Sequence, residues 1–166
     1  MTWAVCAQMR SALLAGAHGA GICDECNAGK FSAAGASACT SCAKGKFSEV
    51  GAASCTTCPP GRYQGSVGQQ DCDVCAAGTA SGEGAASCTA CPEGKYSGAS
   101  AASCSPCAAG TFQGATGKGS CSDCVAGKFS GDGASSCSTC AKGSYSSIKA
   151  PSCMDCPEGS IAASAG

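Results

Sequence analysis

Residues 42–58 read CAKGKFSEVGAASCTTC, and variants of this stretch fill most of the chain. Nine C-x-x-C pairs recur, and successive first cysteines lie 16, 16, 17, 16, 16, 17, 16 and 16 residues apart. A unit of 16 or 17 residues is therefore nested in a triplet of 49. A fixed period of this kind predicts a repeat protein in which each unit packs on its neighbours.

A glycine stands at a fixed position after the C-x-x-C pair in every unit, and a large side chain stands two residues further on in most units. The glycine three residues after the second cysteine, such as Gly45, is present in all nine units. We expect it to supply a positive φ or a close backbone approach. Two residues later an aromatic stands in seven units and is predicted to be the packing residue: Phe31, Phe47, Tyr63, Tyr96, Phe112, Phe129 and Tyr145.

The composition excludes a conventional enzyme-sized core. Leu, Ile, Val and Phe together supply 14 of 166 residues, whereas the chain holds 19 Cys and 25 Gly. So little large apolar surface cannot offset the chain entropy of a globular domain, and the cysteine content predicts a disulfide scaffold instead. The expected fold class is a small disulfide-rich repeat array. We expect an extended rod or solenoid of short β-hairpin and turn loops, with little helix and no conventional core.

The chain divides into a degenerate first repeat, residues 1–22, and nine tandem repeats, residues 23–166, of which the last is truncated. Cys6 stands one 17-residue step before Cys23, but Met9 replaces its expected partner. A signal peptide is the competing interpretation of residues 1–21, although the stretch has no clean apolar run. We expect an array broken at both ends, as in a segment of a longer array or a protomer completed by its neighbours.

Three chemistries use C-x-x-C pairs: a zinc site, thiol redox catalysis and a structural disulfide ladder. Zinc would group the pairs by twos, which nine pairs do not allow evenly. Redox catalysis needs one activated pair on a rigid scaffold rather than many similar copies. We favour the ladder, because it supplies the order that the missing core cannot.

The cysteine count leaves the connectivity of this ladder open. A bridge within C-x-x-C closes a very short loop and belongs to the redox-labile class. Joining the second cysteine of one unit to the first of the next closes 13 or 14 residues and stabilises by roughly 3 kcal/mol. The predicted bridges are therefore Cys26–Cys39, Cys42–Cys55, Cys58–Cys72, Cys75–Cys88, Cys91–Cys104, Cys107–Cys121, Cys124–Cys137 and Cys140–Cys153.

Cys6, Cys23 and Cys156 are left over as unpaired or inter-chain candidates. One option joins Cys6 to Cys23. Cys156 can pair with a following repeat or with a second molecule.

No catalytic, cofactor-binding or metal site is predicted, and the protein is not expected to be an enzyme. His18 lacks the partners of a catalytic histidine, and Asp71 and Asp73 are interpreted as solvated charge rather than Ca²⁺ ligands. The formal net charge of -1 argues against nucleic acid or an anionic membrane as a partner. No segment has the run of about 18 apolar residues that spans a bilayer.

Hydroxyl residues recur after the first cysteine and after the aromatic. The only Asn, Asn27, is followed by Ala-Gly, so no N-linked sequon exists. A chain with little core exposes its hydroxyls, which favours an O-glycan coat, and turn or backbone-bonding side chains are the alternative. The candidate O-glycan residues are Ser32, Ser48, Thr40, Thr56, Thr89, Ser97, Ser105, Ser122, Ser130, Ser138 and Ser146.

The segments Cys58-Pro59-Pro60-Gly61-Arg62-Tyr63 and Cys91-Pro92-Glu93-Gly94-Lys95-Tyr96 resemble the C-P-x-G-x-Y opening of cysteine-rich receptor repeats. The chain is most similar to the ephrin-receptor-like repeats of the growth-factor-receptor cysteine-rich superfamily, and it resembles the first loop of tumour-necrosis-factor-receptor modules. The resemblance implies an extracellular or cell-surface location and agrees with bridges from each opening motif to the next cysteine downstream. Receptor modules interleave further cysteine loops, whereas this chain repeats one short loop.

A uniform array of disulfide loops predicts a rod without a pocket. We therefore expect a structural building block of an extracellular filament or cell-surface appendage, self-assembled from identical chains. The 49-residue triplet fits lateral or helical packing in which every third unit faces an equivalent direction. A stalk or ectodomain segment of a receptor or adhesion protein is the alternative.

Overall fold

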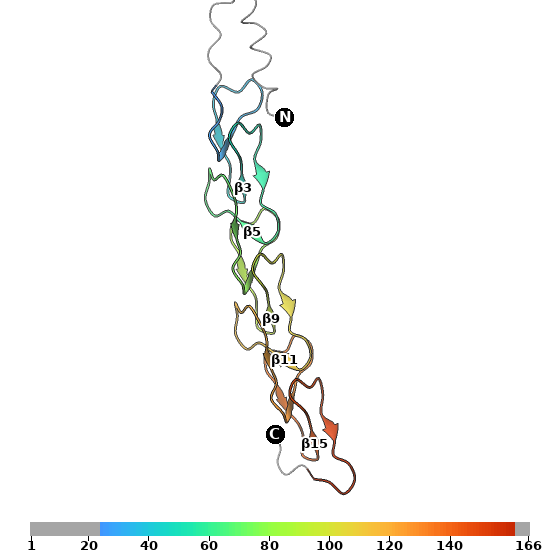
Figure 1. The fold of residues 1–166 in the computed structure, drawn as a ribbon. Helices are drawn as coiled ribbons and strands as arrows, with labels where there is room; N and C mark the ends of the chain where they lie inside the picture. The colour runs from blue at the N-terminus through green and yellow to red at the C-terminus, as the bar shows by residue number, and fades with distance from the viewer. Residues whose placement is uncertain (1–23, 162–166) are drawn as a thin grey trace, which may run out of the picture. The chain divides into compact units, whose positions relative to one another are not determined.

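The computed structural model describes residues 24–161, which form short hairpins joined by turns (Figure 1). These residues contain sixteen two-residue strands and no helix. The strands form eight two-stranded sheets, each made of consecutive strands. This is the predicted disulfide-rich repeat array of short hairpins. The strands are β1 (Lys30–Phe31), β2 (Thr40–Ser41), β3 (Lys46–Phe47), β4 (Thr56–Thr57), β5 (Arg62–Tyr63), β6 (Asp73–Val74), β7 (Thr79–Ala80), β8 (Thr89–Ala90), β9 (Lys95–Tyr96), β10 (Ser105–Pro106), β11 (Thr111–Phe112), β12 (Ser122–Asp123), β13 (Lys128–Phe129), β14 (Ser138–Thr139), β15 (Ser144–Tyr145) and β16 (Met154–Asp155).

A glycine turn starts the first strand of each hairpin. Gly45 has a φ of 75°, and the turn around it closes through a hydrogen bond from the Lys46 N–H to the Ala43 carbonyl (3.1 Å). A positive φ at this third position of a turn favours glycine, because it has no Cβ. The Gly45 carbonyl then accepts the N–H of Cys58, the second cysteine of the next C-x-x-C pair (2.9 Å). The glycine three residues after each C-x-x-C pair therefore has the positive φ that the sequence predicts, and its carbonyl links the turn to the second strand of the hairpin.

Eight disulfides run along the described residues, and each closes 13 or 14 residues with Cα atoms 5.6–5.9 Å apart. They are the eight pairs that the loop-closure argument predicts, from Cys26–Cys39 to Cys140–Cys153. Cys156 is half-buried and is the free cysteine of the described part of the chain. Cys6, Cys23 and the degenerate first repeat, residues 1–22, lie outside it.

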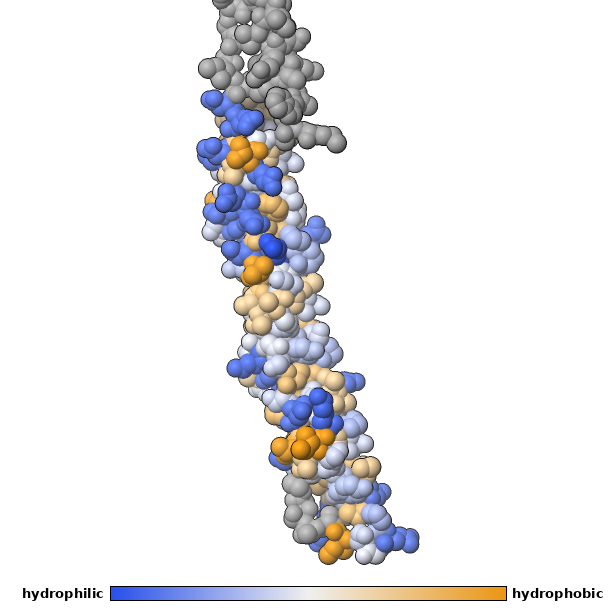
Figure 2. All heavy atoms as spheres, viewed as in Figure 1, coloured by the Kyte–Doolittle hydropathy of each residue, from blue (hydrophilic) through white to orange (hydrophobic). Residues whose placement is uncertain are grey.

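The interior consists of cystines rather than aromatic rings. The largest fully buried side chains are all cysteines, and Cys42, Cys58 and Cys91 have no exposed surface. The aromatic residues, predicted to be the packing residues, are half-buried in six repeats, and Tyr145 is 45% exposed. That prediction is wrong for Tyr145, and the other six rings are only half-buried, so they form no core of their own. Large apolar side chains such as Val125 and Ile148 remain exposed. On the face shown in Figure 2, strongly hydrophobic residues are scattered among polar ones.

The described backbone groups into two compact units. The first holds residues 24–59, Tyr63–Asp73 and Glu83–Ser87, and the second holds Pro60–Arg62, Val74–Gly82 and residues 88–161. Within each unit, neighbouring repeats are joined by backbone hydrogen bonds.

The bonds between repeats recur with the 49-residue step of the sequence. In the first unit the N–H of Gly45 donates to the Gln64 carbonyl, and in the second the N–H of Gly94 donates to the Gln113 carbonyl, both at 2.8 Å. Isolated parallel β-bridges follow the same step. They join the residue two positions after the conserved glycine to an alanine of the next repeat: Phe31 to Ala52, Ala80 to Ala101 and Phe129 to Ala150. The triplet is therefore a structural period as well as a period of cysteine spacing.

Candidate functional site: the exposed face of each hairpin

Five of the eight hairpins place an aromatic ring and a hydroxyl side chain opposite each other. Phe47 of β3 pairs with Thr56 of β4, and Tyr96 of β9 pairs with Ser105 of β10. Directly opposed residues of an antiparallel pair project from the same face, so ring and hydroxyl are neighbours. Six predicted glycan candidates occupy this second-strand position and all are exposed; we call them the hydroxyl row: Thr40, Thr56, Thr89, Ser105, Ser122 and Ser138.

The serines that follow the aromatic are turned inward instead. The Ser48 hydroxyl donates to the Lys30 carbonyl of the preceding repeat (3.0 Å) and lies 3.3 Å from the Sγ of Cys42. A glycan acceptor must face solvent, so the prediction of O-glycans is wrong for the buried members of this group. They are Ser48, Ser97, Ser130 and Ser146, which are 2–5% exposed and bonded to a carbonyl of the preceding repeat. Ser32, at the same repeat position, is half-buried.

Two glutamines replace this serine in the two 17-residue repeats, and the sequence reasoning missed them. The Gln64 side chain donates to the Asp71 carbonyl (2.7 Å) and accepts the N–H of Ser66 (2.9 Å). Gln113 repeats both contacts one triplet later, with the Ser120 carbonyl and the Ala115 N–H. The longer amide thus spans the loop that has an extra residue. The signal was available in the sequence: after the aromatic, Gln occurs only where the cysteine spacing is 17.

The variant Gln64→Ser is expected to loosen the Cys58–Cys72 loop. Gln64 is 6% exposed, and the shorter side chain loses both contacts, which costs about 1–2 kcal/mol. Amide exchange at Ser66 should therefore accelerate by roughly 5- to 30-fold by local opening. The matched variant Gln113→Ser should accelerate Ala115 instead and leave Ser66 unchanged. Unaltered exchange at both amides would show that the glutamines do not hold these loops.

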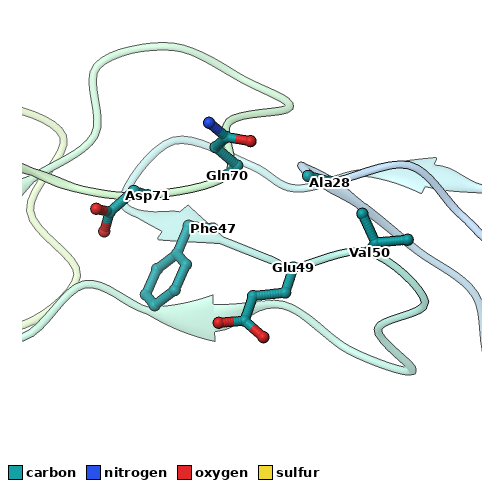
Figure 3. Close-up of a pocket in the computed structure, with 6 residues that line it drawn as sticks. All are labelled: Ala28, Phe47, Glu49, Val50, Gln70 and Asp71. Atoms are coloured by element: carbon teal, nitrogen blue, oxygen red, sulfur yellow. The ribbon is translucent and has the colours of Figure 1, made fainter.

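An open depression beside Phe47 interrupts the regularity of the first unit (Figure 3). Val50 is 57% exposed there, and the Asp71 Oδ1 accepts the N–H of Cys72 (2.7 Å). One triplet later the places of Glu49, Val50 and the neighbouring polar residues are taken by small residues at 98, 99, 119 and 120. The depression is therefore a local feature and not part of the repeated face. Its lining residues are Ala28, Phe47, Glu49, Val50, Gln70 and Asp71.

The cysteines are engaged in S–S bonds, which removes them as zinc ligands. Sixteen of the described sulfurs are paired as cystines, whereas zinc binds thiolates. In residues 24–161, no group of three or more His, Cys, Asp or Glu residues is placed to hold a metal ion. His18 lies outside the described residues.

Two stretches of the hairpin array match a known protein family. Residues 45–83 and 94–129 match the family described as tyrosine-protein kinase ephrin type A/B receptor-like. These segments are ephrin-receptor-like cysteine-rich repeats. The two matches of the ephrin-receptor-like family begin 49 residues apart, on Gly45 and Gly94, and so fall on the same phase of the triplet. No curated protein matches the sequence. Within the described residues, no helix has the length and apolar character needed to cross a membrane.

Proposed function

We propose that the array of ephrin-receptor-like repeats is a structural building block of an extracellular filament or cell-surface appendage, assembled from identical chains. The observation that carries this proposal is the 49-residue recurrence of the hydrogen bonds between repeats. A contact that recurs at a fixed step along the chain can be continued by another copy of the same face, and head-to-tail contacts of this kind build open filaments. The role needs no catalysis.

An extracellular setting is supported by the chemistry of the cystines. Disulfides persist in oxidising compartments, and small repeats without a core depend on them for order. Because every buried apolar side chain of the described residues is a cysteine or an alanine, we place the working protein outside the reducing cytosol.

A stalk or ectodomain segment of a receptor or adhesion protein is the second candidate. The depression beside Phe47 favours it, because that place carries Glu49, Val50 and Gln70 where the next triplet carries small residues. A ligand-binding module needs such a departure from the repeat. The family match is compatible with both candidates.

We also propose that O-glycans, if the filament carries them, are attached to the hydroxyl row. Its six members are exposed, and their hydroxyls enter no hydrogen bond within residues 24–161. The four buried serines after the aromatic are excluded by burial and by their bonds to backbone carbonyls, as at Ser130 (2.9 Å to the Thr111 carbonyl). A coat on the hydroxyl row would lie on the outer face of six of the eight hairpins.

Electron microscopy of native material, combined with intact-mass measurement, tests the proposal. We expect filaments, and a mass above the 15.7 kDa of the chain with the added mass mapped to peptides containing Thr56 or Ser105 and not to Ser48 or Ser97. Compact monodisperse particles would contradict filament assembly. An unmodified mass would refute the glycan coat while leaving the filament standing.

A further inference from the structure

We propose that the array is a tension-bearing element in which a pull along the chain passes through the cystines and bypasses the loops between them. This deepens the proposed structural role. It concerns a single chain, so it can be tested separately from filament assembly.

The load path follows from which cysteines are joined. Between Cys75 and Cys88 the backbone runs through 13 residue steps, but the disulfide holds the two Cα atoms 5.7 Å apart. A pull on the ends of the chain is carried by the shortest covalent route, so the longer backbone between these cysteines stays slack. The next load-bearing segment is the two-residue link from Cys88 to Cys91, after which the Cys91–Cys104 bridge repeats the arrangement.

The limit of extension can be calculated from these distances. A C-x-x-C link of three peptide steps reaches about 10 Å when fully extended. From Cys26 to Cys153, the bridged chain therefore extends to about 120 Å, given bridges with Cα atoms 5.6–5.9 Å apart. Without its bridges, the same stretch extends to about 440 Å. The cystines thus reduce the maximal length more than threefold.

The disulfide-closed loop and the C-x-x-C link of each repeat are consequently loaded differently when the chain is pulled. The aromatic residue and the motif glycine, such as Tyr96 and Gly94, lie in the slack loop, whereas Ser105 and Pro106 lie in the loaded link between Cys104 and Cys107. A pull can break the hydrogen bonds between repeats, for example from the Gly94 N–H to the Gln113 carbonyl (2.8 Å). Each loop nevertheless stays closed by its cystine, so the broken hydrogen bonds can re-form without a long-range search by the chain. Motions over a loop of about ten residues take about 100 ns or less.

The test is single-molecule force extension of the whole chain with a handle fused to each end. We expect the oxidised protein to reach a contour length about 320 Å shorter than the same protein treated with a dithiol reductant, which converts each cystine to two thiols. Equal contour lengths before and after reduction would overturn the proposal, since the bridges would then not carry the load.

Variants that remove one disulfide test the same load path, because each should add a fixed increment to the contour length. Cys75→Ser with Cys88→Ser should lengthen the oxidised chain by about 40 Å, and Cys140→Ser with Cys153→Ser should add the same increment. The increment depends on covalent connectivity and not on how well the opened loop folds. The control Cys156→Ser should leave the length unchanged, because that thiol is free. Absence of the increment in both bridge variants, or a change in the control, would contradict the load path.

Discussion

The variant Gly94→Ala is expected to disrupt the repeats around it and to lower the local free energy of unfolding by at least about 3 kcal/mol. Gly94 has a φ of 75°, a conformation that costs an L-residue about 1–2 kcal/mol. An added Cβ would also overlap the carbonyl oxygen and carbon of Gly133, which belongs to the second loop along the chain. Both colliding atoms are backbone, so no side chain can move aside. The close approach of Gly94 to Gly133 is therefore part of how the loops stack.

Gly143→Ala is the matched control, because Gly143 has the same repeat position and a φ of 86° but no atom within 4 Å of the added Cβ. It should lose only about 1–2 kcal/mol from backbone strain. Hydrogen exchange at the Gly133 amide, which donates to the Cys107 carbonyl (2.7 Å), reports the difference locally. If the two variants lose equal stability, the stacking contact contributes nothing.

Complete reduction is expected to abolish the fold under otherwise native conditions. Each bridge contributes roughly 3 kcal/mol by restricting the unfolded chain, and the buried apolar side chains that would remain are cysteines, Ala80 and Ala150. Those side chains are too small to offset the entropy of ordering the chain. Reduced and alkylated protein should therefore lose the slow exchange of the Cys58 and Cys107 amides and should expand in solution. Retained protection after alkylation would mean that another part of the chain supplies the core.

Spacing alone predicted the repeat, the triplet, the hairpin loops and the bridge pattern, because a constant interval between cysteines restricts which pairs can form similar loops. Spacing could not predict which hydroxyls face solvent. Thr56 and Ser48 are equally polar, yet Thr56 lies on the outer face of β4, while Ser48 donates to a carbonyl 18 residues earlier in the chain. That difference is decided by contacts between repeats, which have no local sequence signature.

The burial of the aromatic residues also depends on contacts that the sequence does not show: Tyr145 is 45% exposed, and the other six are half-buried. A large side chain in seven of the nine repeats suggests a core, but the fully buried side chains are the second cysteines of the C-x-x-C pairs, and the rings are half-buried or exposed. Backbone contacts between repeats also override local preference. Ser100 and Lys149, which lie 49 residues apart, adopt φ values of 59° and 62° where most repeats have glycine. Both N–H groups donate to a cysteine carbonyl of the preceding repeat (2.9 Å), which holds them in this conformation.

The central claim is that consecutive disulfide loops take the place of a hydrophobic core, and peptide mapping of the native, unreduced protein tests it most directly. Mass spectrometry after proteolysis without reduction should recover links from each second cysteine to the next first cysteine, such as Cys42–Cys55 and Cys91–Cys104, with none inside a C-x-x-C pair. Bridges within C-x-x-C pairs, or free thiols at these positions, would contradict the account.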